Sequence, residues 1–366
     1  MKLAEPFTTA WSRAGSTLLR RLFLDRQAAF WLSELDPVRS LTGVRAEVVG
    51  VIDETADTKT FLLRPNARWR PHRAGQHTVL EVEIDGVRER RCYSIASAPG
   101  QAPMAITVKR VPGGRVSSWL HERARPGLVV GLDRPAGDFV LPTPHPGTLL
   151  LLSGGSGITP VMSMLRDLAA RDAVDDVVFV HHARSRAGVI FGDELAALAA
   201  RHRGLRLVIR LDDSVDGPPG FDEARLADTV PDFANRSTYL CGPPAMMERV
   251  DAMWTAAGAS HRLASERFQP APRLTALAGD GHPVPVALTR SGRELVVDGD
   301  GSLLDQLERA GERPPSGCRM GICHTCTCRK TAGTVQNLIT GEVSSAPDEE
   351  IQLCISAPRS ELQLEL

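Results

Sequence analysis

Hydrophobic positions follow a helical period at the start of the 366-residue chain. Within residues 1–42, Leu18 and Leu22 share one face of a predicted helix, and arginines interrupt the apolar stripe. Asp36-Pro37 closes the pattern, because the residue before a proline disfavours helical geometry. The pattern predicts a helical N-terminal extension.

The period changes in residues 43–146. Short, β-branched and partly alternating runs such as VRAEVVGVIDE, HTVLEVEI and MAITVKRV are separated by turn sequences such as DGVRE and VPGG. Strands of this length and spacing are typical of antiparallel barrels and sandwiches. This segment therefore predicts an antiparallel β-barrel or sandwich.

Apolar strands alternate with amphipathic helices in residues 147–268. GTLLLLSG, DVVFVHHA and STYLCGP have the composition of buried strands, and ITPVMSMLRDLAA and FGDELAALAARH have helical periodicity. Continuously apolar strands interleaved with helices are typical of a parallel, doubly wound α/β sheet.

A Pro-, Gly- and Ala-rich stretch, residues 269–283, predicts a linker to a small last unit. Residues 284–366 contain a predicted hairpin (VPVALTR and RELVVDG), a helix (SLLDQLERAG) and a cysteine-rich loop. Eight Lys or Arg residues stand against twelve Asp or Glu residues there. The last unit is therefore acidic.

Composition narrows the class of protein. An apolar content of 42% and the chain length fit two or three globular domains, and the net charge of −1 gives no indication of nucleic-acid binding. Five of the seven cysteines come after residue 317, which indicates a metal site in a reducing compartment rather than a disulfide framework. The N-terminus lacks signal-peptide features, and no apolar run approaches the roughly 20 residues that cross a bilayer. We expect a cytoplasmic protein.

The cysteine loop has the spacing of an iron–sulfur site. Cys318-x4-Cys323-x2-Cys326 is followed after 27 further residues by Cys354. Four thiolates in this arrangement are typical of a plant-type 2Fe–2S centre. Zinc is the main alternative, although structural zinc sites usually come as paired CxxC knuckles.

Other residues of this loop are expected to support the cluster or to lie beside it without binding iron. Gly317 and Gly321 would let backbone N–H groups turn toward the cluster sulfides, and these dipoles, with burial, tune the reduction potential. Cys328 is expected to be a buried free thiol on the following strand. His324 could replace a cysteine as in Rieske centres, but those centres use two histidines.

Residues 284–366 resemble a plant-type ferredoxin domain through SGCRMGICHTC and the distant Cys354. The resemblance implies a β-grasp fold of the α+β class. It also implies that Cys318, Cys323, Cys326 and Cys354 hold a 2Fe–2S cluster.

Arg91-Cys92-Tyr93-Ser94 resembles the RxYS flavin signature of the ferredoxin–NADP reductase family. Arg91 can neutralise a flavin phosphate, Tyr93 can lie against the isoalloxazine ring, and Ser94 can donate a hydrogen bond to the flavin. The alternative is a solvated arginine beside a core tyrosine.

A second element about twenty residues later supports FAD. Gly114-Arg115-Val116-Ser117 matches the GxxS element that this family uses for the flavin pyrophosphate, and a glycine turn at a helix N-terminus presents N–H groups to phosphate. The alternative is a hairpin turn followed by an N-cap serine.

A glycine-rich turn follows the first strand of the predicted α/β domain. Gly154, Gly155 and Gly157 precede Thr159 and Pro160, which suit a helix start. Such a strand–helix junction can hold a phosphate. The pattern is similar to the GGxGxTP of the family's NAD(P) domain.

Two further motifs resemble the same family. The strand STYLC ends at Cys241, and Gly242 and Pro243 follow it. Members of the family have a Cys-Gly-Pro near the nicotinamide at this position. SERF ends the module, which implies that Glu266 and Phe268 lie close to the flavin. With Tyr93 and Ser94, the resemblance makes Cys241 and Glu266 the candidate catalytic residues. A buried structural cysteine is the alternative for Cys241.

The second strand of the α/β domain indicates which dinucleotide binds. Arg184-Ser185-Arg186 follows VVFVHHA, and no acidic residue occurs before Asp193. Arginine suits the 2′-phosphate of NADPH, whereas an acidic residue would accept the ribose hydroxyl of NADH. NADPH is favoured and NADH is kept as the alternative, since these arginines could simply be solvated.

The order of the three units resembles the reductases of phthalate-dioxygenase-reductase and phenylacetyl-CoA-epoxidase-reductase type. The resemblance implies hydride transfer from NADPH to FAD, then single-electron transfer through the 2Fe–2S cluster to an external acceptor protein. No histidine set for di-iron, facial triad or haem motif occurs in the chain. The terminal acceptor is therefore expected to be a separate redox protein.

The N-terminal extension gives an indication of which protein accepts the electrons. With FWLSELDPVRSL it resembles the actinobacterial reductases of stearoyl-CoA Δ9-desaturases, which implies a membrane fatty-acyl-CoA desaturase as client. Residues 1–36, with Trp11 and Trp31, could contact a membrane peripherally, and a helix packed on the barrel is the alternative. Other hypotheses are a Rieske, di-iron or P450 oxygenase client, a redox sensor or carrier, and an oxygenase component that itself hydroxylates.

Overall fold

The computed structural model of the protein describes residues 38, 43–212, 221–268, 282–317, 319, 321 and 324–366. The predicted N-terminal helix with its membrane contact lies outside these residues. So does the predicted linker, apart from its last two positions.

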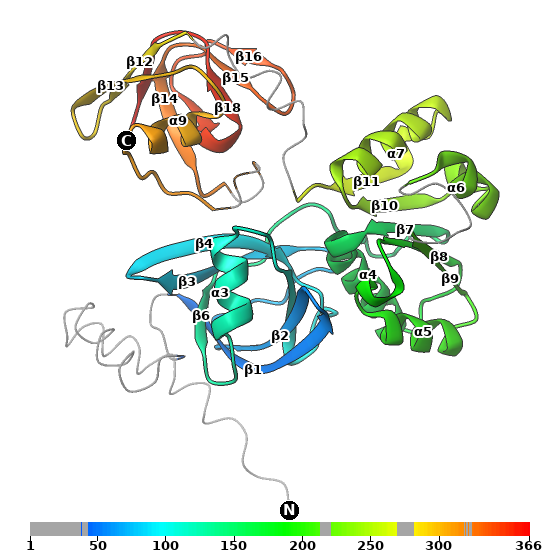
Figure 1. The fold of residues 1–366 in the computed structure, drawn as a ribbon. Coiled ribbons are helices and arrows are strands. Elements are labelled where there is room, and N and C mark those ends of the chain that lie inside the picture. Colours follow the sequence, from blue (N-terminus) through cyan, green and yellow to red (C-terminus); the bar gives the residue numbers. More distant parts are fainter. Residues whose placement is uncertain are drawn as a thin grey trace, which may run out of the picture.

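An antiparallel sheet of six strands forms the first domain (Figure 1), in the order β4-β3-β6-β1-β2-β5. A bridge between Ile95 and Ile106 brings the two edge strands together, so the sheet is barrel-like as predicted. Helix α3, Arg115–Arg123, buries Val116 and Leu120 in the barrel core. The strands are β1 (Val44–Thr55), β2 (Thr58–Pro65), β3 (His77–Ile84), β4 (Val87–Ser94), β5 (Met104–Lys109) and β6 (Val129–Leu132).

Five parallel strands form the second domain, in the order β11-β10-β7-β8-β9. Figure 1 shows α4 and α5 on one face of this sheet and α6 and α7 on the other. The strands are β7 (Leu149–Gly154), β8 (Val177–Ala183), β9 (Leu205–Leu211), β10 (Ser237–Cys241) and β11 (Leu263–Glu266). The helices are α4 (Ile158–Ala170), α5 (Gly192–Arg201), α6 (Glu223–Thr229) and α7 (Pro244–Ala256).

Alternation along β7 explains the two helical layers. Leu149 and Leu151 join the core under α4 and α5, whereas Leu150 and Leu152 join the core under α7. Because both faces of a parallel sheet are covered, its strands are continuously apolar. The doubly wound sheet predicted from GTLLLLSG is confirmed.

The last domain forms a separate lobe in Figure 1 and has a mixed five-stranded sheet, in the order β13-β12-β19-β14-β17. β12 (Val284–Leu288) and β13 (Arg293–Val297) form the predicted hairpin. Helix α9, Leu303–Arg309, starts at Ser302, whose Oγ accepts the Asp305 N–H at 3.2 Å. The other strands are β14 (Thr327–Ala332), β15 (Val335–Asn337), β16 (Val343–Ser344), β17 (Glu349–Gln352), β18 (Ser356–Pro358) and β19 (Leu362–Leu364).

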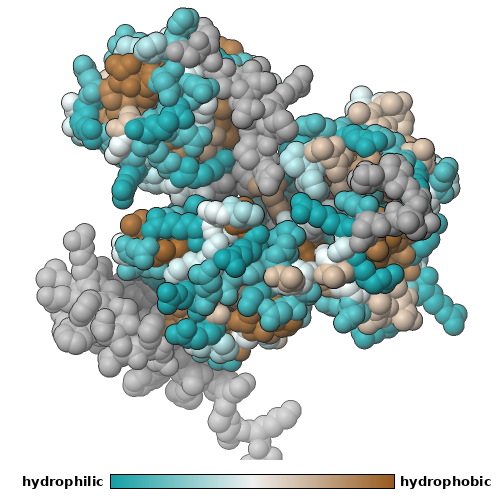
Figure 2. Space-filling model, viewed as in Figure 1, coloured by the Kyte–Doolittle hydropathy of each residue, from teal (hydrophilic) through white to brown (hydrophobic). Residues whose placement is uncertain are grey.

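The molecular surface is mostly hydrophilic on the face that Figure 2 shows, with smaller hydrophobic areas between the polar residues. Within the described residues, no helix has the length and apolar composition needed to cross a membrane.

Helix α4 holds the parallel-sheet domain against the barrel. Ser163 Oγ donates to the carbonyl oxygen of Ser97 at 2.7 Å, and Arg166 Nη1 donates to that of Ala96 at 2.7 Å. Arg166 also pairs with Glu194 of α5, with Nε 2.8 Å from Oε1. The two bonds to Ser97 and Ala96 end on the segment directly after β4, so they fix the RxYS strand relative to the glycine turn.

Replacing Arg166 should weaken this junction. In Arg166→Met we expect the free energy of unfolding to fall by about 1.5–3 kcal/mol, since a charged hydrogen bond across the interface is lost. Urea unfolding measures the change. The control is Arg171→Met, which removes an exposed pair with Asp167 on the same helix and should cost about 0–1 kcal/mol. Equal losses in both variants would contradict this role.

Candidate active site and metal centre

Strand β4 carries the predicted flavin signature at the edge of the barrel. Tyr93 packs against the barrel core, and its burial raises the pKa of the phenol above the usual value. Arg91 is partly exposed, and Ser94 is buried with 4% of its surface accessible. The strand thus presents a cation and an aromatic ring on one face and a hydroxyl on the other.

The two predicted FAD motifs meet at the start of α3. Arg91 Nη1 lies 3.4 Å from Glu89 Oε2, and Arg115 Nη1 lies 3.1 Å from Glu89 Oε1. Gly114 is the N-cap, and a Cβ there would lie 2.5 Å from Ser117 Oγ. Arg115 also pairs with Asp85, with Nη2 3.5 Å from Oδ2, so the two arginines gather with two carboxylates at a helix N-terminus. The backbone N–H groups of that helix start and the two guanidinium groups fit a dinucleotide phosphate.

The side chain of Ser117 is engaged within its own turn. Its Oγ accepts the N–H of Val111 at 3.1 Å and donates to the carbonyl oxygen of Gly114 at 3.3 Å. Val116 is buried in the barrel core. Direct phosphate binding by Ser117 therefore stays a prediction.

The glycine turn and the Cys-Gly-Pro motif contact each other across the sheet. A Cβ on Gly157 would collide with the carbonyl oxygen of Cys241, and one on Gly154 would lie 2.7 Å from Pro243 Cδ. Glycine is required at position 157 because two backbones approach closely, and at position 154 because the Pro243 ring occupies the space of a side chain. Gly242 completes the contact, since a Cβ there would lie 3.2 Å from the Gly154 nitrogen.

The same turn leads into helix α4 through a single 3₁₀ turn, Gly155–Gly157. Gly155 has φ +53°, and no described atom lies within 4 Å of where a Cβ would stand, so its backbone is open to a ligand. Thr159 Oγ1 donates to the carbonyl oxygen of Ser156 at 3.1 Å and stabilises the turn. An open N–H cradle at a 13-residue helix fits a dinucleotide phosphate.

The predicted NADPH discriminators follow strand β8. Arg184 and Arg186 are exposed and Ser185 is half-buried. Neither arginine forms an ion pair with any residue in the part of the chain that the structure describes. Both guanidinium groups are therefore available to a phosphate.

A buried polar cluster lies where the barrel meets the parallel sheet. Ser94 Oγ donates to Glu266 Oε2 at 3.4 Å, and His77 Nδ1 lies 3.5 Å from Glu266 Oε1. Cys241 is the registered neighbour of Glu266 in the parallel pair β10–β11. Burial, together with the Glu266 charge, raises the pKa of the Cys241 thiol well above its usual value. The predicted catalytic residues Ser94, Cys241 and Glu266 are thus brought together as a protonated thiol, a hydroxyl and a carboxylate.

Phe268 is partly buried and packs against the core of the parallel-sheet domain. Its predicted proximity to the flavin stays a prediction.

Sequence reasoning missed two buried histidines, one at this interface and one within the parallel sheet. His77 lies within the apolar strand HTVLEVEI, and only its cross-strand pairing with Ser94 brings it to Glu266. His181 Nδ1 lies 2.8 Å from Ser153 Oγ at the end of β7, and burial lowers the pKa of His181 to about 3. Neither residue belongs to a recognisable motif, so no local signal could have identified them.

The structure describes two of the four predicted cluster ligands. Cys326 and Cys354 are buried, whereas Cys318 and Cys323 lie outside the described residues. The N–H of Leu353 donates to the carbonyl oxygen of Cys326 at 3.2 Å, which brings the two ligand-bearing segments together.

Gly321 directs its backbone N–H at a ligand cysteine, and the predicted contact of Gly317 and Gly321 with the cluster sulfides stays a prediction. The φ of Gly321 is +76°, and its N–H donates to Cys354 Sγ at 3.2 Å. A Cβ there would lie 2.8 Å from Ile355 Cδ1. An N–H directed at a cysteine sulfur is a feature of iron–sulfur sites, so the donor set fits a cluster.

Two side chains near the metal centre, Cys328 and His324, were not predicted to bind the cluster. Cys328 is a buried thiol on β14, as expected, and burial raises its pKa to about 11. His324 Nδ1 lies 2.8 Å from Gln352 Nε2, which also donates to the carbonyl oxygen of Gly321. His324 therefore supports the loop through Gln352.

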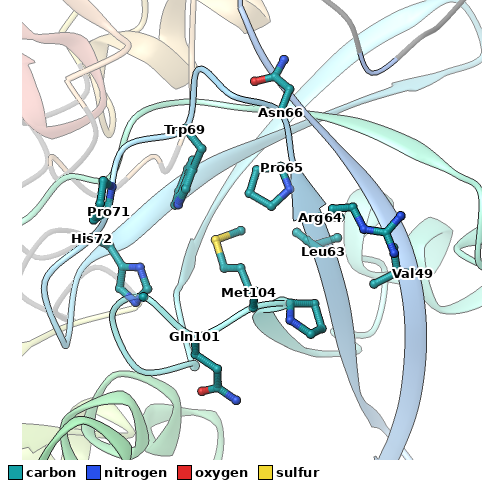
Figure 3. Close-up of a pocket in the computed structure, with 13 residues that line it drawn as sticks. Val49, Leu63, Arg64, Pro65, Asn66, Trp69, Pro71, His72, Gln101 and Met104 are labelled. Atoms are coloured by element: carbon teal, nitrogen blue, oxygen red, sulfur yellow. The ribbon is translucent and has the colours of Figure 1, made fainter. Parts of the chain in front are cut away.

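A pocket of about 570 Å³ lies elsewhere on the barrel, between the loops that follow β2 and β4. Figure 3 shows Trp69 and Met104 facing it, with His72 and Gln101 at one side. None of the predicted FAD, NAD(P) or cluster residues lines it. Asn66 at its rim donates to the carbonyl oxygen of Val38 at 3.0 Å, so the pocket adjoins the start of the barrel domain.

Comparison with known protein families matches each domain separately. Residues 46–141 match the oxidoreductase FAD-binding domain, residues 151–252 the oxidoreductase NAD-binding domain, and residues 286–359 the 2Fe-2S iron-sulfur cluster binding domain.

Several relatives match along most of the chain. An NADPH oxidoreductase of Mycobacterium tuberculosis is 41% identical over 92% of this chain and 88% of that protein. The glycine betaine monooxygenase reductase subunit of Pseudomonas aeruginosa is 34% identical over 90% and 98% of the two chains. The solved structure of phthalate dioxygenase reductase has a TM-score of 0.65 at 27% identity, covering 89% of this chain and 98% of that one.

The chain belongs to the phthalate dioxygenase reductase-like family of FAD-, NAD- and 2Fe–2S-binding oxidoreductases. Membership confirms the fold class, the enzyme class and the three cofactors predicted from the sequence. It gives no support to the desaturase resemblance, because two of these relatives are named for oxygenase systems.

The cluster ligands of this phthalate dioxygenase reductase-like protein can be tested by substitution. We expect Cys354→Ala and Cys326→Ala to lose most bound iron and acid-labile sulfide, because each removes one thiolate from a four-thiolate site. Cys328→Ala is the matched control and should keep its full content of iron and acid-labile sulfide. Iron and sulfide assays on protein purified without oxygen make the comparison, and a full cluster in Cys354→Ala would contradict the ligand set.

Proposed function

We propose that this protein is the NADPH-dependent reductase component of an oxygenase system. It takes a hydride from NADPH onto FAD and passes electrons singly through its 2Fe–2S domain to a separate oxygenase protein. The observation that carries the proposal is the convergence of Ser94, Cys241 and Glu266 beside the glycine turn, on a chain that also carries a 2Fe–2S domain.

The barrel residues would bind and orient FAD. Arg91, Arg115 and the N-terminus of α3, including Gly114 and Ser117, would hold its phosphates. Tyr93 would lie against the ring, and the Ser94 hydroxyl would donate to it. Bound FAD supplies the chemistry that takes two electrons together and releases them one at a time.

The parallel-sheet residues would bind the dinucleotide. Gly155, Gly157 and Thr159 would hold its pyrophosphate at the start of α4. The close contact between Gly157 and the backbone of Cys241 and Gly242 would bring the nicotinamide toward the buried cluster. A neutral Cys241 thiol beside Glu266 would exclude water from the site of hydride transfer.

The acceptor is inferred from relatives. One is named as a reductase subunit of glycine betaine monooxygenase and one as the reductase of phthalate dioxygenase. These names support an oxygenase over a desaturase. Cys318, Cys323, Cys326 and Cys354 would hold the cluster from which that acceptor takes electrons.

The acceptor can be tested by reconstitution. The protein and NADPH are mixed with a Rieske oxygenase, a soluble di-iron oxygenase, a cytochrome P450 or a desaturase in liposomes. We expect reduction of at least one oxygenase that depends on both NADPH and the intact cluster, with Cys354→Ala as control. Reduction of the desaturase alone would overturn the oxygenase proposal, and failure to reduce even ferricyanide would overturn the reductase proposal.

The dinucleotide preference rests on the two exposed arginines after β8 and on the sequence that contains them. In the double variant Arg184→Ala/Arg186→Ala we expect the KM for NADPH to rise roughly tenfold or more, because a lost charged hydrogen bond costs about 1.5–3 kcal/mol. The KM for NADH should change little. The control is Arg203→Ala, which removes an exposed arginine beyond α5. Equal changes for both dinucleotides would contradict 2′-phosphate recognition.

A further inference from the structure

Ser153 and His181 form a buried polar pair inside the parallel sheet, and the proposed reaction does not use it. They are registered neighbours on β7 and β8, both are fully buried, and Ser153 Oγ lies 2.8 Å from His181 Nδ1. Their side chains point to the same face as Leu151 and Phe179, which belong to the apolar core under α4 and α5. Two polar side chains therefore follow apolar residues on one face of both strands.

The pair makes a directional contact without adding charge. His181 Nε2 has no hydrogen-bond partner among the residues that the structure describes, so within this part of the chain the bond to Ser153 is the polar contact that orients the ring. Burial, with a smaller effect of the neighbouring His182, lowers the pKa of His181 to about 3, and the imidazole is neutral near pH 7. Burying these polar atoms is costly, because they lose their hydrogen bonds to water.

The bond lies where both strands lead into the proposed dinucleotide loops. Ser153 is followed directly by the glycine turn of residues 154–157, and His181 lies three residues before the first of the two proposed 2′-phosphate arginines. Main-chain pairing between β7 and β8 ends one position further on, at Gly154 and His182. The bond is therefore one of the last links between the two strands before the glycine turn and the arginines separate.

NADPH and NADH would use the two loops differently. Both dinucleotides have the pyrophosphate that the glycine turn would hold, whereas only NADPH has a 2′-phosphate for Arg184 and Arg186. NADPH therefore has to bind two loops at once, and its affinity depends on how well their separation matches the ligand. The affinity for NADH depends much less on that separation, because NADH has no 2′-phosphate to bring to the second loop.

We propose that Ser153 and His181 are positioning residues that set the separation of the pyrophosphate turn from the 2′-phosphate arginines, and thereby the preference for NADPH over NADH. Both side chains are fully buried, so they act through the two loops rather than by touching the dinucleotide. This inference rests on the proposed NADPH-dependent function and extends it to the residues that determine selectivity.

Steady-state kinetics with both dinucleotides and ferricyanide tests the pair. In Ser153→Ala, and in His181→Phe, which keeps an aromatic ring, we expect the ratio of kcat/KM for NADPH to kcat/KM for NADH to fall about fivefold or more. The change should appear in the KM for NADPH, with kcat nearly constant. Ser153→Thr keeps the hydroxyl group and should keep most of the wild-type ratio.

The matched control is Thr107→Val in the barrel. Thr107 Oγ1 lies 2.7 Å from Thr60 Oγ1, so this variant also removes a buried side-chain hydrogen bond between neighbouring strands. It should lower the stability toward urea, as Ser153→Ala does, and leave the dinucleotide ratio unchanged. A ratio that falls equally in Thr107→Val, or that keeps the wild-type value in Ser153→Ala and His181→Phe, would overturn the proposal.

A second measurement needs no turnover. Calorimetric titration compares adenosine 2′,5′-bisphosphate, which has both phosphates, with adenosine 5′-monophosphate, which lacks the 2′-phosphate. We expect Ser153→Ala and His181→Phe to weaken binding of the bisphosphate about fivefold or more and to leave binding of the monophosphate almost unchanged. Equal affinities of the wild type for the two fragments would overturn the NADPH preference itself. A wild-type preference that survives in both variants would overturn only the role of the pair.

Discussion

A single buried carboxylate connects the two nucleotide-binding domains. Glu266 ends the parallel sheet, yet its oxygens face Ser94 and His77 of the barrel. A buried carboxylate is tolerated only with polar partners, so both domains must keep this orientation. Ser163 and Arg166 maintain it from helix α4, through carbonyl groups just after β4. The relative position of the two proposed cofactor sites depends on these contacts.

Close backbone approach is the second constraint. The glycine turn after β7 lies against the carbonyl oxygen of Cys241 because Gly157 has no side chain. In the metal centre, Gly321 adopts a positive φ and directs its N–H at Cys354 Sγ. In both places glycine allows the backbone itself to supply the polar groups near a cofactor. A reductase that handles charged cofactors in a dry interface needs such fixed dipoles.

Much of this arrangement could be predicted from the sequence. The change from alternating to continuously apolar strands predicted the barrel and the parallel sheet, because strand composition depends on whether one face or both are buried. Cysteine spacing and glycine turns are local, so the motifs at Gly154 and Cys318 could be recognised directly. His77 and the pair of Ser153 with His181 could not, because they depend on which strands become neighbours. The same holds for Glu89, which two arginines from separate motifs share.

The central claim is that one chain separates the two electrons of a hydride. FAD takes up both electrons together, and the 2Fe–2S cluster then receives them one at a time. Anaerobic stopped-flow mixing of the purified protein with NADPH tests it directly, by following flavin and cluster absorbance separately. The account predicts that flavin bleaching comes first and that cluster bleaching follows it in the same molecule. A cluster that stays oxidised after the flavin is fully reduced, or that bleaches before the flavin, would contradict it.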